Sequence, residues 1–216
     1  MSWFETKKGL DLILLEKKIL NNIFDQIFGF NILQVGDIPS LIDESRFKYK
    51  LDKSNLSFNP SSLPFDNDSI DCVVYPHQDT DNILMLQEAY RVLIPQGYAI
   101  FINFNPWSLM GIKTFFSLKN EFPWNQTTES FTSFQNKVLE NGFEIINGKF
   151  FGYHPSFKSA SYSSNWDKIG DRWFPIFANI YLLVVRKKII TLTPIKPSWK
   201  SREQKNQVKV SKKYDF

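Results

Sequence analysis

Cysteine is almost missing from this chain of 216 residues, which holds only Cys72. A single cysteine cannot form an internal disulfide and excludes a zinc site built from cysteines. Histidine is nearly as rare, with His77 and His154 alone, so a histidine-rich metal site is excluded as well. We therefore expect a protein without a metal site, in a reducing compartment such as the cytoplasm.

Long apolar runs are also lacking. No stretch approaches the roughly 18 apolar residues of a membrane-spanning helix, so no membrane span is expected. The first residues, Met1–Glu5, lack the basic and apolar regions of a signal peptide. Apolar residues still make up 43% of the chain, which is enough for a sizeable core in one domain with extensions.

Charge is distributed unevenly along the chain. The formal net charge is +4, but the segment Arg186–Phe216 alone holds ten Lys or Arg and two acids. The remaining chain is mildly acidic, with 16 bases and 20 acids. A basic end of this kind attracts nucleic acid, an anionic membrane surface or an acidic partner. The alternative is a solvated, extended tail with no partner.

Apolar residues recur in a pattern that alternates between strands and helices. Amphipathic spacing predicts helices over 11–28, 81–93, 108–118 and 130–141. Short apolar or alternating runs predict strands over 31–35, 46–51, 55–58, 70–75, 98–103, 143–151 and 179–186. Such an order favours a largely parallel sheet, whose ligands lie beyond the carboxyl ends of its strands.

Two motifs carry a resemblance to a known family. Leu63–Val74 reads LPFDNDSIDCVV, similar to the methyltransferase pattern LPF-x-D-x-S-F-D-x-V. Glu88–Gly97 reads EAYRVLIPQG, similar to E-x-x-R-V-L-x-P-G-G. The chain thus resembles class I S-adenosylmethionine-dependent methyltransferases with a type-11-like domain. Phe104–Gly111 and Arg186–Ile195 further resemble a divergent proteobacterial branch of that family, with a degenerate glycine loop.

The resemblance implies a fold, a cofactor and a division of the chain. The fold is α/β, a Rossmann-like seven-stranded sheet that is mostly parallel with an antiparallel last strand and helices on both faces. The implied cofactor is S-adenosylmethionine. We expect an N-terminal amphipathic helix packed on the core in 1–29, the methyltransferase-like domain in 30–188 and a basic tail in 189–216. Gly36 and Asn59 are only 23 residues apart, so the region around strand two is expected to be shortened.

The glycine loop of the family, typically acid-x-G-x-G-x-G, corresponds to the stretch from Gln34 to Pro39. Glycines in this loop let the backbone approach a ligand closely. Gly36 is the one glycine of the pattern that this sequence retains. Asp37 is expected near the amino group of the cofactor. Ile38 and Pro39 are expected to fill part of the space that the cofactor takes in relatives. The alternative is a simple strand-to-turn transition.

Three further residues are implied as cofactor contacts. Asp52 corresponds to the acid that binds the ribose hydroxyls, with an exposed turn aspartate as the alternative. Asn59 corresponds to the residue whose carbonyl reads the adenine amino group, although Asn-Pro also commonly starts a turn. Leu63 would pack near the adenine, or belong to the plain core.

The remaining candidates follow the next two strands. Tyr75 and His77 lie in the loop that the family places between donor and acceptor, where Tyr75 would contact the cofactor. His77 is the candidate general base, because its reference pKa is near 6.5; the alternative is a solvated loop side chain. Asn105 and Trp107 are candidates for a substrate wall, or for a rigid turn with a core tryptophan. The aromatic segment 152–174 would cap a pocket or cover the sheet edge.

Two functions from different classes remain open. The first is transfer of a methyl group from S-adenosylmethionine to an unknown acceptor; the cofactor carries the electrophile, so the chemistry demands no particular catalytic residue. The second is a catalytically inactive binding or regulatory module, favoured by the degenerate glycine loop. Nucleic-acid attachment through the basic tail is compatible with either function.

Overall fold

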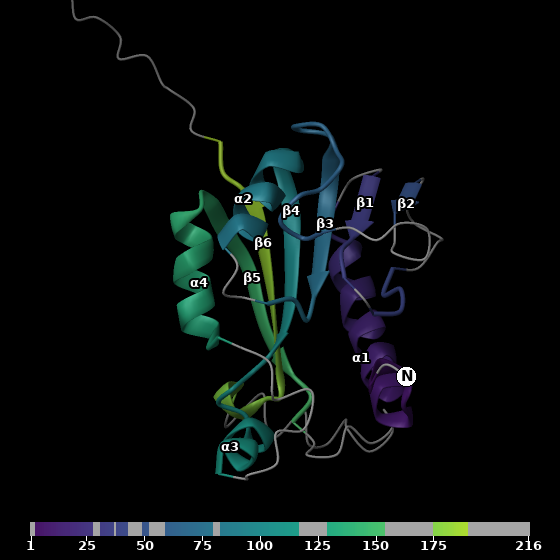
Figure 1. Cartoon of the computed structure of the whole chain (residues 1–216), viewed down its shortest axis with the longest axis vertical. Coiled ribbons are helices and arrows are strands. Elements are labelled where there is room, and N and C mark those ends of the chain that lie inside the picture. Colours follow the sequence, from purple (N-terminus) through teal and green to yellow (C-terminus); the bar gives the residue numbers. More distant parts are fainter. Residues whose placement is uncertain are drawn as a thin grey trace, which may run out of the picture.

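A computed structural model describes residues 3–27, 31–36, 38–42, 49–51, 59–79, 83–116, 129–153 and 175–189. They form one sheet of six strands (Figure 1). The strands are β1 (Asn31–Gln34), β2 (Tyr49–Leu51), β3 (Ile70–Pro76), β4 (Leu93–Phe104), β5 (Phe143–Phe151) and β6 (Ile180–Lys187). The helices are α1 (Lys7–Phe24), α2 (Ile83–Val92), α3 (Leu109–Phe116) and α4 (Phe131–Glu140), with single 3-10 turns η1 (Trp3–Glu5) and η2 (Pro175–Phe177).

The strand order is β2-β1-β3-β4-β6-β5. Neighbours from β2 to β4 are parallel, whereas β6 is antiparallel to both β4 and β5. A mixed α/β sheet with an antiparallel last strand is therefore confirmed. Six strands are described rather than seven, because the stretch 55–58 expected to form the other one lies outside the described residues.

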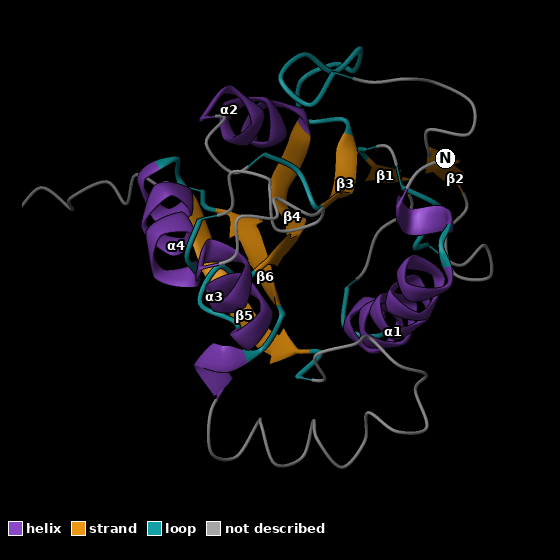
Figure 2. Cartoon of the chain, turned by 60° about the horizontal axis from the view of Figure 1, so that its bottom comes forward, coloured by secondary structure: helices purple, strands orange, loops and turns teal. Residues whose placement is uncertain are grey.

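Side chains alternate between the two faces of the sheet, and each face has its own core. On β3, Cys72 and Val74 lie in the core formed with α1, whereas Val73 and Tyr75 lie in the core formed with α2 and α4. The same alternation continues along β4 and β6. Helices thus cover both faces (Figure 2). Among the described residues, no helix is long and apolar enough to cross a membrane.

The N-terminal helix α1 begins at Lys7, four residues before the expected start, because Thr6 caps it. The Thr6 hydroxyl oxygen accepts a hydrogen bond from the backbone N–H of Gly9 at 3.3 Å and donates to the carbonyl of Trp3 at 2.6 Å. η1 folds back so closely that a Cβ added at Gly9 would lie 2.5 Å from Phe4 Cα. This close approach requires glycine and stacks Phe4 on the ring of His77, directly after β3. The carboxyl edge of the parallel strands is the lower edge in Figure 1.

The boundaries of β4 differ from the expected ones. The sequence predicts a turn at 95–97 and a strand from Tyr98, but β4 begins at Leu93. Leu93 pairs with Ile70 and Tyr98 with Cys72, so the residues between them bulge out of the ladder. Gln96 has a φ of 65° within this bulge. The turn residues are thus accommodated inside the strand.

The connection between β1 and β2 is short. Its described residues, 35–36 and 38–42, form no helix. The rest of the expected shortened region, at 43–48 and 52–58, lies outside the described residues. Among the described residues, α1 is thus the long helix on its face of the sheet.

Two leucines on opposite sides of α1 test its packing. Leu20 is 0% exposed and Leu14 is 63% exposed. We expect Leu20→Ala to lower the free energy of unfolding by about 2–5 kcal/mol, because it leaves a cavity in the core. Leu14→Ala should change it by less than about 0.5 kcal/mol. Chemical denaturation measures both, and equal losses would contradict the packing of α1 on the sheet.

Candidate functional site

The carboxyl ends of β1 and β3 lie at a switch in strand order. After β1 the chain continues to β2 on one side, and β3 then pairs with β1 on the other side. Open α/β sheets bind ligands at such a point. The N–H of Val35 extends the ladder to the carbonyl of Val74 at 2.9 Å, and Gly36 follows with a φ of 135°. The loops after β1 and β3 therefore meet at Gly36.

The side chain of Gln78 covers Gly36. Gln78 Nε2 donates a hydrogen bond to the carbonyl of Pro76 at 3.0 Å. A Cβ added at Gly36 would collide with this same nitrogen. Gln78 is half-buried, and its amide is the far end of a flexible side chain. The space that glycine leaves open above its Cα is thus filled by a group that can move.

Gln34 ties the loop after β1 to the end of that strand. Its Oε1 accepts from the N–H of Leu41 at 2.8 Å, and its Nε2 lies 3.3 Å from the carbonyls of Ile38 and Pro39. Ile38 is buried in the core on the side of α1, whereas Pro39 is exposed. The side chain that covers Gly36 is therefore Gln78. That Ile38 and Pro39 fill part of the space that the cofactor takes in relatives stays a prediction.

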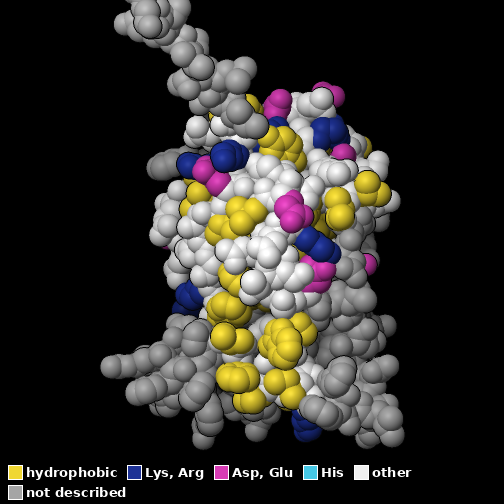
Figure 3. Space-filling model, turned by 90° about the vertical axis from the view of Figure 1, so that its left-hand side faces the viewer, with side chains coloured by type: hydrophobic (Ala, Val, Ile, Leu, Met, Phe, Trp, Pro, Cys, Tyr) yellow, Lys and Arg dark blue, Asp and Glu magenta, His cyan; other side chains and the backbone are white. Residues whose placement is uncertain are grey.

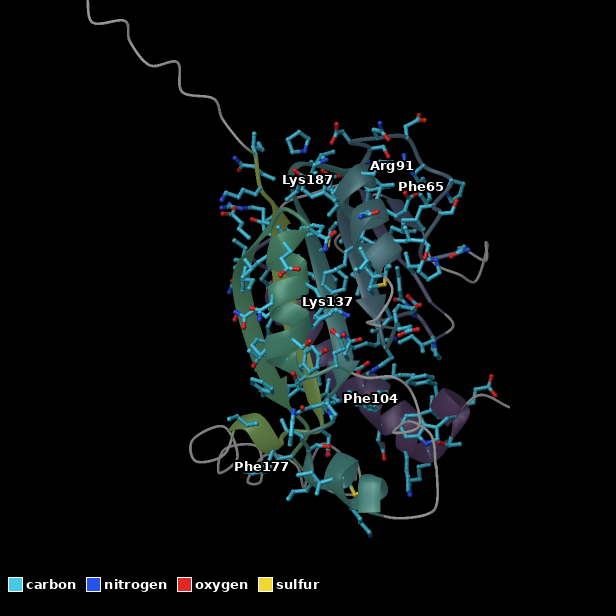
Figure 4. All side chains as sticks on the ribbon, turned by 60° about the vertical axis from the view of Figure 1, so that its left-hand side comes forward. Phe65, Arg91, Phe104, Lys137, Phe177 and Lys187 are labelled. Carbon is cyan, nitrogen blue, oxygen red and sulfur yellow. The ribbon has the colours of Figure 1, made fainter. Side chains whose placement is uncertain are left out.

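The two family motifs meet in one polar clamp. Glu88 Oε1 accepts from the N–H of Leu63 at 2.7 Å, and Arg91 Nη2 donates to the carbonyl of Leu63 at 3.1 Å. Arg91 also donates to Glu88 Oε2 at 2.9 Å and to Asn67 Oδ1 at 2.7 Å. In Figure 4, Arg91 and Phe65 lie at the opposite end of the sheet from Phe104. The motifs therefore hold the loop before β3, away from the carboxyl edge.

The clamp gives Glu88 a perturbed ionisation. The hydrogen bond from Arg91 lowers the pKa of the Glu88 carboxyl below its ordinary value, and the N–H of Leu63 adds to this effect against the opposing effect of burial. A carboxyl with a lowered folded pKa stabilises the fold above its unfolded pKa of about 4.3. That contribution is lost as the pH falls through the lowered folded value.

Glu88→Gln tests this linkage. We expect the variant to unfold more easily than the wild type at pH 7, because the charge-assisted bonds to Arg91 are weakened. We also expect it to lose less additional stability below about pH 4.3, since position 88 no longer takes up a proton. Denaturation at several pH values measures both effects, with exposed Glu140→Gln as the control. Parallel curves for wild type and Glu88→Gln would contradict the assignment.

His77 follows β3 directly and is buried, so the alternative of a solvated loop histidine is wrong. Its Nε2 lies 2.8 Å from Glu16 Oε1 of α1, and its backbone N–H donates to the carbonyl of Ile102 at 2.6 Å. The ring stacks on Phe104 with centroids 4.1 Å apart and on Phe4 at 5.5 Å. The backbone φ of 50° is unusual for a residue other than glycine.

Glu16 was not predicted from the sequence as a site residue, although its position on the apolar face of α1 could have indicated one. It lies on the buried face of α1 between Leu12 and Ile19, at helical spacing. A carboxylate inside an apolar stripe is rarely fully buried without a partner. Gln78 had no comparable signal, because its position over Gly36 depends on how two separate loops meet.

The other expected cofactor residues lie in different surroundings. Asn59 is exposed, and its Oδ1 accepts from the N–H of Ser61 at 3.0 Å, which forms a local turn. Leu63 is buried under α2. The Tyr75 ring stacks on Phe101 at 5.3 Å, and its hydroxyl has no hydrogen-bond partner among the described residues. Burial, with a smaller effect of the charge of Glu88, raises the pKa of Tyr75.

Asn105 organises the end of β4. Its Nδ2 donates to the carbonyls of Ile176 and Ala178 at 2.6 and 2.9 Å, and its Oδ1 accepts from the N–H of Trp107 at 3.1 Å. The side chain thus joins β4 to η2, as a turn-forming residue would. Trp107 is 59% exposed, so the expected alternative of a core tryptophan is wrong.

An exposed apolar surface surrounds Trp107. Its large side chains are Trp107, Leu109, Ile176 and Phe177, which come from α3, η2 and the turn before α3. Hydrophobic side chains gather at this end of the molecule in Figure 3, and Phe177 is labelled there in Figure 4. An apolar face beside the carboxyl edge is suited to a partly apolar ligand.

Several expected features lie outside the described residues: Asp37, Asp52, most of the aromatic segment at 154–174, and the tail at 190–216. Within the described ranges, no group of three His, Cys, Asp or Glu side chains could hold a metal ion. Burial raises the pKa of the Cys72 thiol, with the charge of Asp71 as a smaller cause. Cys72 is therefore an inert core residue rather than a nucleophile.

Comparisons with known proteins agree with this architecture. No protein-family model matches the chain. The uncharacterized protein YafS of Escherichia coli K12 is 26% identical over 193 residues, which cover 83% of this chain and 78% of YafS. A methyltransferase structure from Thermotoga maritima, described as a possible histamine N-methyltransferase, superposes with a TM-score of 0.57 at 17% identity, covering 82% of this chain and 89% of its own.

Two further solved structures share the fold. Geranyl diphosphate methyltransferase in complex with S-adenosylmethionine has a TM-score of 0.55 at 11% identity, covering 85% of this chain and 92% of that one. This chain has the class I S-adenosylmethionine-dependent methyltransferase fold. The [4+2]-cyclase SpnF also matches it, with a TM-score of 0.53, 12% identity and coverage of 80% and 81%. The methyltransferase fold thus also occurs in a protein named for a different reaction.

Proposed function

We propose that the protein is a methyltransferase that binds S-adenosylmethionine at the carboxyl edge between β1 and β3 and methylates an as yet unidentified acceptor. The observation that carries the proposal is the geometry at Gly36. This glycine stands at the switch in strand order with a φ of 135°, and the amide end of Gln78 is the group nearest to a Cβ added there, with the carbonyl oxygen of Pro76 beyond it at 3.5 Å. Solved structures of this fold, one of them in complex with S-adenosylmethionine, support the choice of cofactor.

The proposed cofactor residues are Gly36, Asp37, Asp52, Asn59 and Tyr75. Leu63, expected beside the adenine, instead lies in the core under α2 with its backbone held by the clamp of Glu88 and Arg91. Gly36 allows close backbone approach. Asn59 fits an adenine contact because it is exposed and its Oδ1, which already accepts one hydrogen bond from Ser61, retains a second lone pair. Bound S-adenosylmethionine would supply the electrophilic methyl group, so the chain mainly orients the reactants and excludes water.

The proposed acceptor side is the apolar surface around Trp107. It lies at the end of β4, beyond the same carboxyl edge as Gly36 and His77. Asn105 fixes the backbone there rather than binding the acceptor with its own amide, because that amide already binds Ile176, Ala178 and Trp107. In this proposal Trp107 supplies the contact with the acceptor.

Calorimetric titration with S-adenosylmethionine tests the function. We expect saturable binding to the wild-type protein, and tighter binding to Gln78→Ala, because the alanine leaves the space above Gly36 open. Gln87→Ala is the matched control and should bind like the wild type, because Gln87 is an exposed side chain of α2. An absence of heat for both wild type and Gln78→Ala at millimolar cofactor would reject cofactor binding and favour a scaffold without catalysis.

Asn59→Leu tests the adenine contact separately. Leucine is nearly isosteric with asparagine but has no carbonyl, so we expect the affinity for S-adenosylmethionine to fall about tenfold, the equivalent of one lost hydrogen bond. Asn59→Asp keeps the oxygen acceptor and should retain most of the affinity. The same titration measures both variants, and an unchanged affinity of Asn59→Leu would refute this role.

A further inference from the structure

His77 and Glu16 form a buried pair at the carboxyl edge. Their side chains are 1% and 0% exposed, with His77 Nε2 and Glu16 Oε1 2.8 Å apart. Two atoms of the pair, His77 Nδ1 and Glu16 Oε2, are buried without a hydrogen-bond partner among the described residues. Buried polar atoms are normally satisfied, so an unsatisfied pair at a functional edge calls for a role.

The contact between His77 Nε2 and Glu16 Oε1 is compatible with either partner as the donor. We assign Glu16 as the acceptor, as an ionised carboxylate would be, which makes Nε2 the donor. In the neutral imidazole the lone pair then lies on Nδ1. Nδ1 is therefore the nitrogen that can take a proton, and the Glu16 carboxylate stabilises the imidazolium that results. A base oriented in this way by a second group is the arrangement that proton-transfer catalysis requires.

The surroundings hold the ring in place. Phe104 and Phe4 stack on it at 4.1 and 5.5 Å, with interplanar angles of 21° and 28°. The backbone N–H of His77 is fixed to Ile102, and its φ of 50° is maintained despite the strain. η1, a turn of three residues, brings Phe4 onto the face of the ring.

We propose that Glu16 is a positioning residue for His77, and that His77 Nδ1 removes the proton of an uncharged, hydroxyl-bearing acceptor such as a phenol. The proposal rests on the proposed methyltransferase function. The O–H bond breaks with its electrons left on oxygen, and its proton forms the new bond to Nδ1. The oxygen then bonds to the methyl carbon, while the electrons of the broken carbon–sulfur bond stay on sulfur.

The choice of a hydroxyl follows from the lining of the pair. Phe4 and Phe104 cover the imidazole with apolar rings. A charged ammonium acceptor would lose its hydration there, at a much higher cost than a neutral hydroxyl. The charge of Glu16 is already directed at Nε2, which leaves Nδ1 to a hydrogen-bond donor.

Nitrogen NMR of the imidazole tests the role of Glu16. The chain has two histidines, so His154→Gln leaves His77 as the single ring signal of the full-length protein. We expect a protonated Nε2 and an unprotonated Nδ1 at neutral pH. Glu16→Gln should give a mixture of tautomers, and Glu16→Asp should restore one. A wild-type ring with its proton on Nδ1 would overturn the proposal even if the Glu16 variants fail to fold.

Phenol and anisole form a matched pair of probes for the hydroxyl site, because only phenol has an O–H donor. We expect phenol, with or without S-adenosylhomocysteine, to shift the Nδ1 signal, and anisole to leave it unchanged. A merely structural ion pair would respond to neither. No response of Nδ1 to phenol would therefore overturn the acceptor assignment. A phenol response without any cofactor binding would keep the hydroxyl site and reject methyl transfer.

Discussion

Burial of both faces is the constraint on which this structure depends. Parallel strands leave no face for water, so each side of the sheet needs a covering layer. α2 and α4 share one side, but on the other side the described residues supply α1 as the long helix. On that side α1 and the turn η1 before it reach the carboxyl edge of the parallel strands. The same packing that completes the core thus brings Glu16 and Phe4 to His77.

Much of the fold was predictable because its signals are local. The apolar runs of β3 and β6 and the amphipathic spacing of α1 depend on neighbouring residues, and the structure has these elements within a few residues of the expected ranges. The family motifs were legible for the same reason. Glu88 and Arg91 bind the backbone of Leu63 from α2, after the chain has passed through β3, so the two motifs that lie close in the sequence also meet in the fold.

The site was less predictable because its contacts join distant parts of the chain. His77 was singled out as a loop histidine, but its environment is set by Glu16, 61 positions away. Gln78 over Gly36 joins two loops that follow different strands. Trp107 was expected in a wall or in the core, and its exposure depends on how Asn105 joins β4 to η2. None of these contacts can be inferred from the spacing of residues in the sequence.

The fold by itself leaves the reaction open, since a cyclase shares it with methyltransferases. Side chains therefore have to distinguish methyl transfer from another reaction. Glu88 and Arg91 stabilise the loop before β3, and Asn105 holds the backbone of η2 against the end of β4. Neither contact favours one reaction over another. Gly36 with Gln78 concerns what binds, whereas His77 with Glu16 concerns whether a proton moves. Gly36 follows β1, whereas His77 and Gln78 follow β3, and Glu16 comes from α1. Because Gln78, which covers Gly36, is the next residue after His77, a ligand that displaces Gln78 would act on the loop that carries His77, which makes the tautomer of His77 part of the binding question.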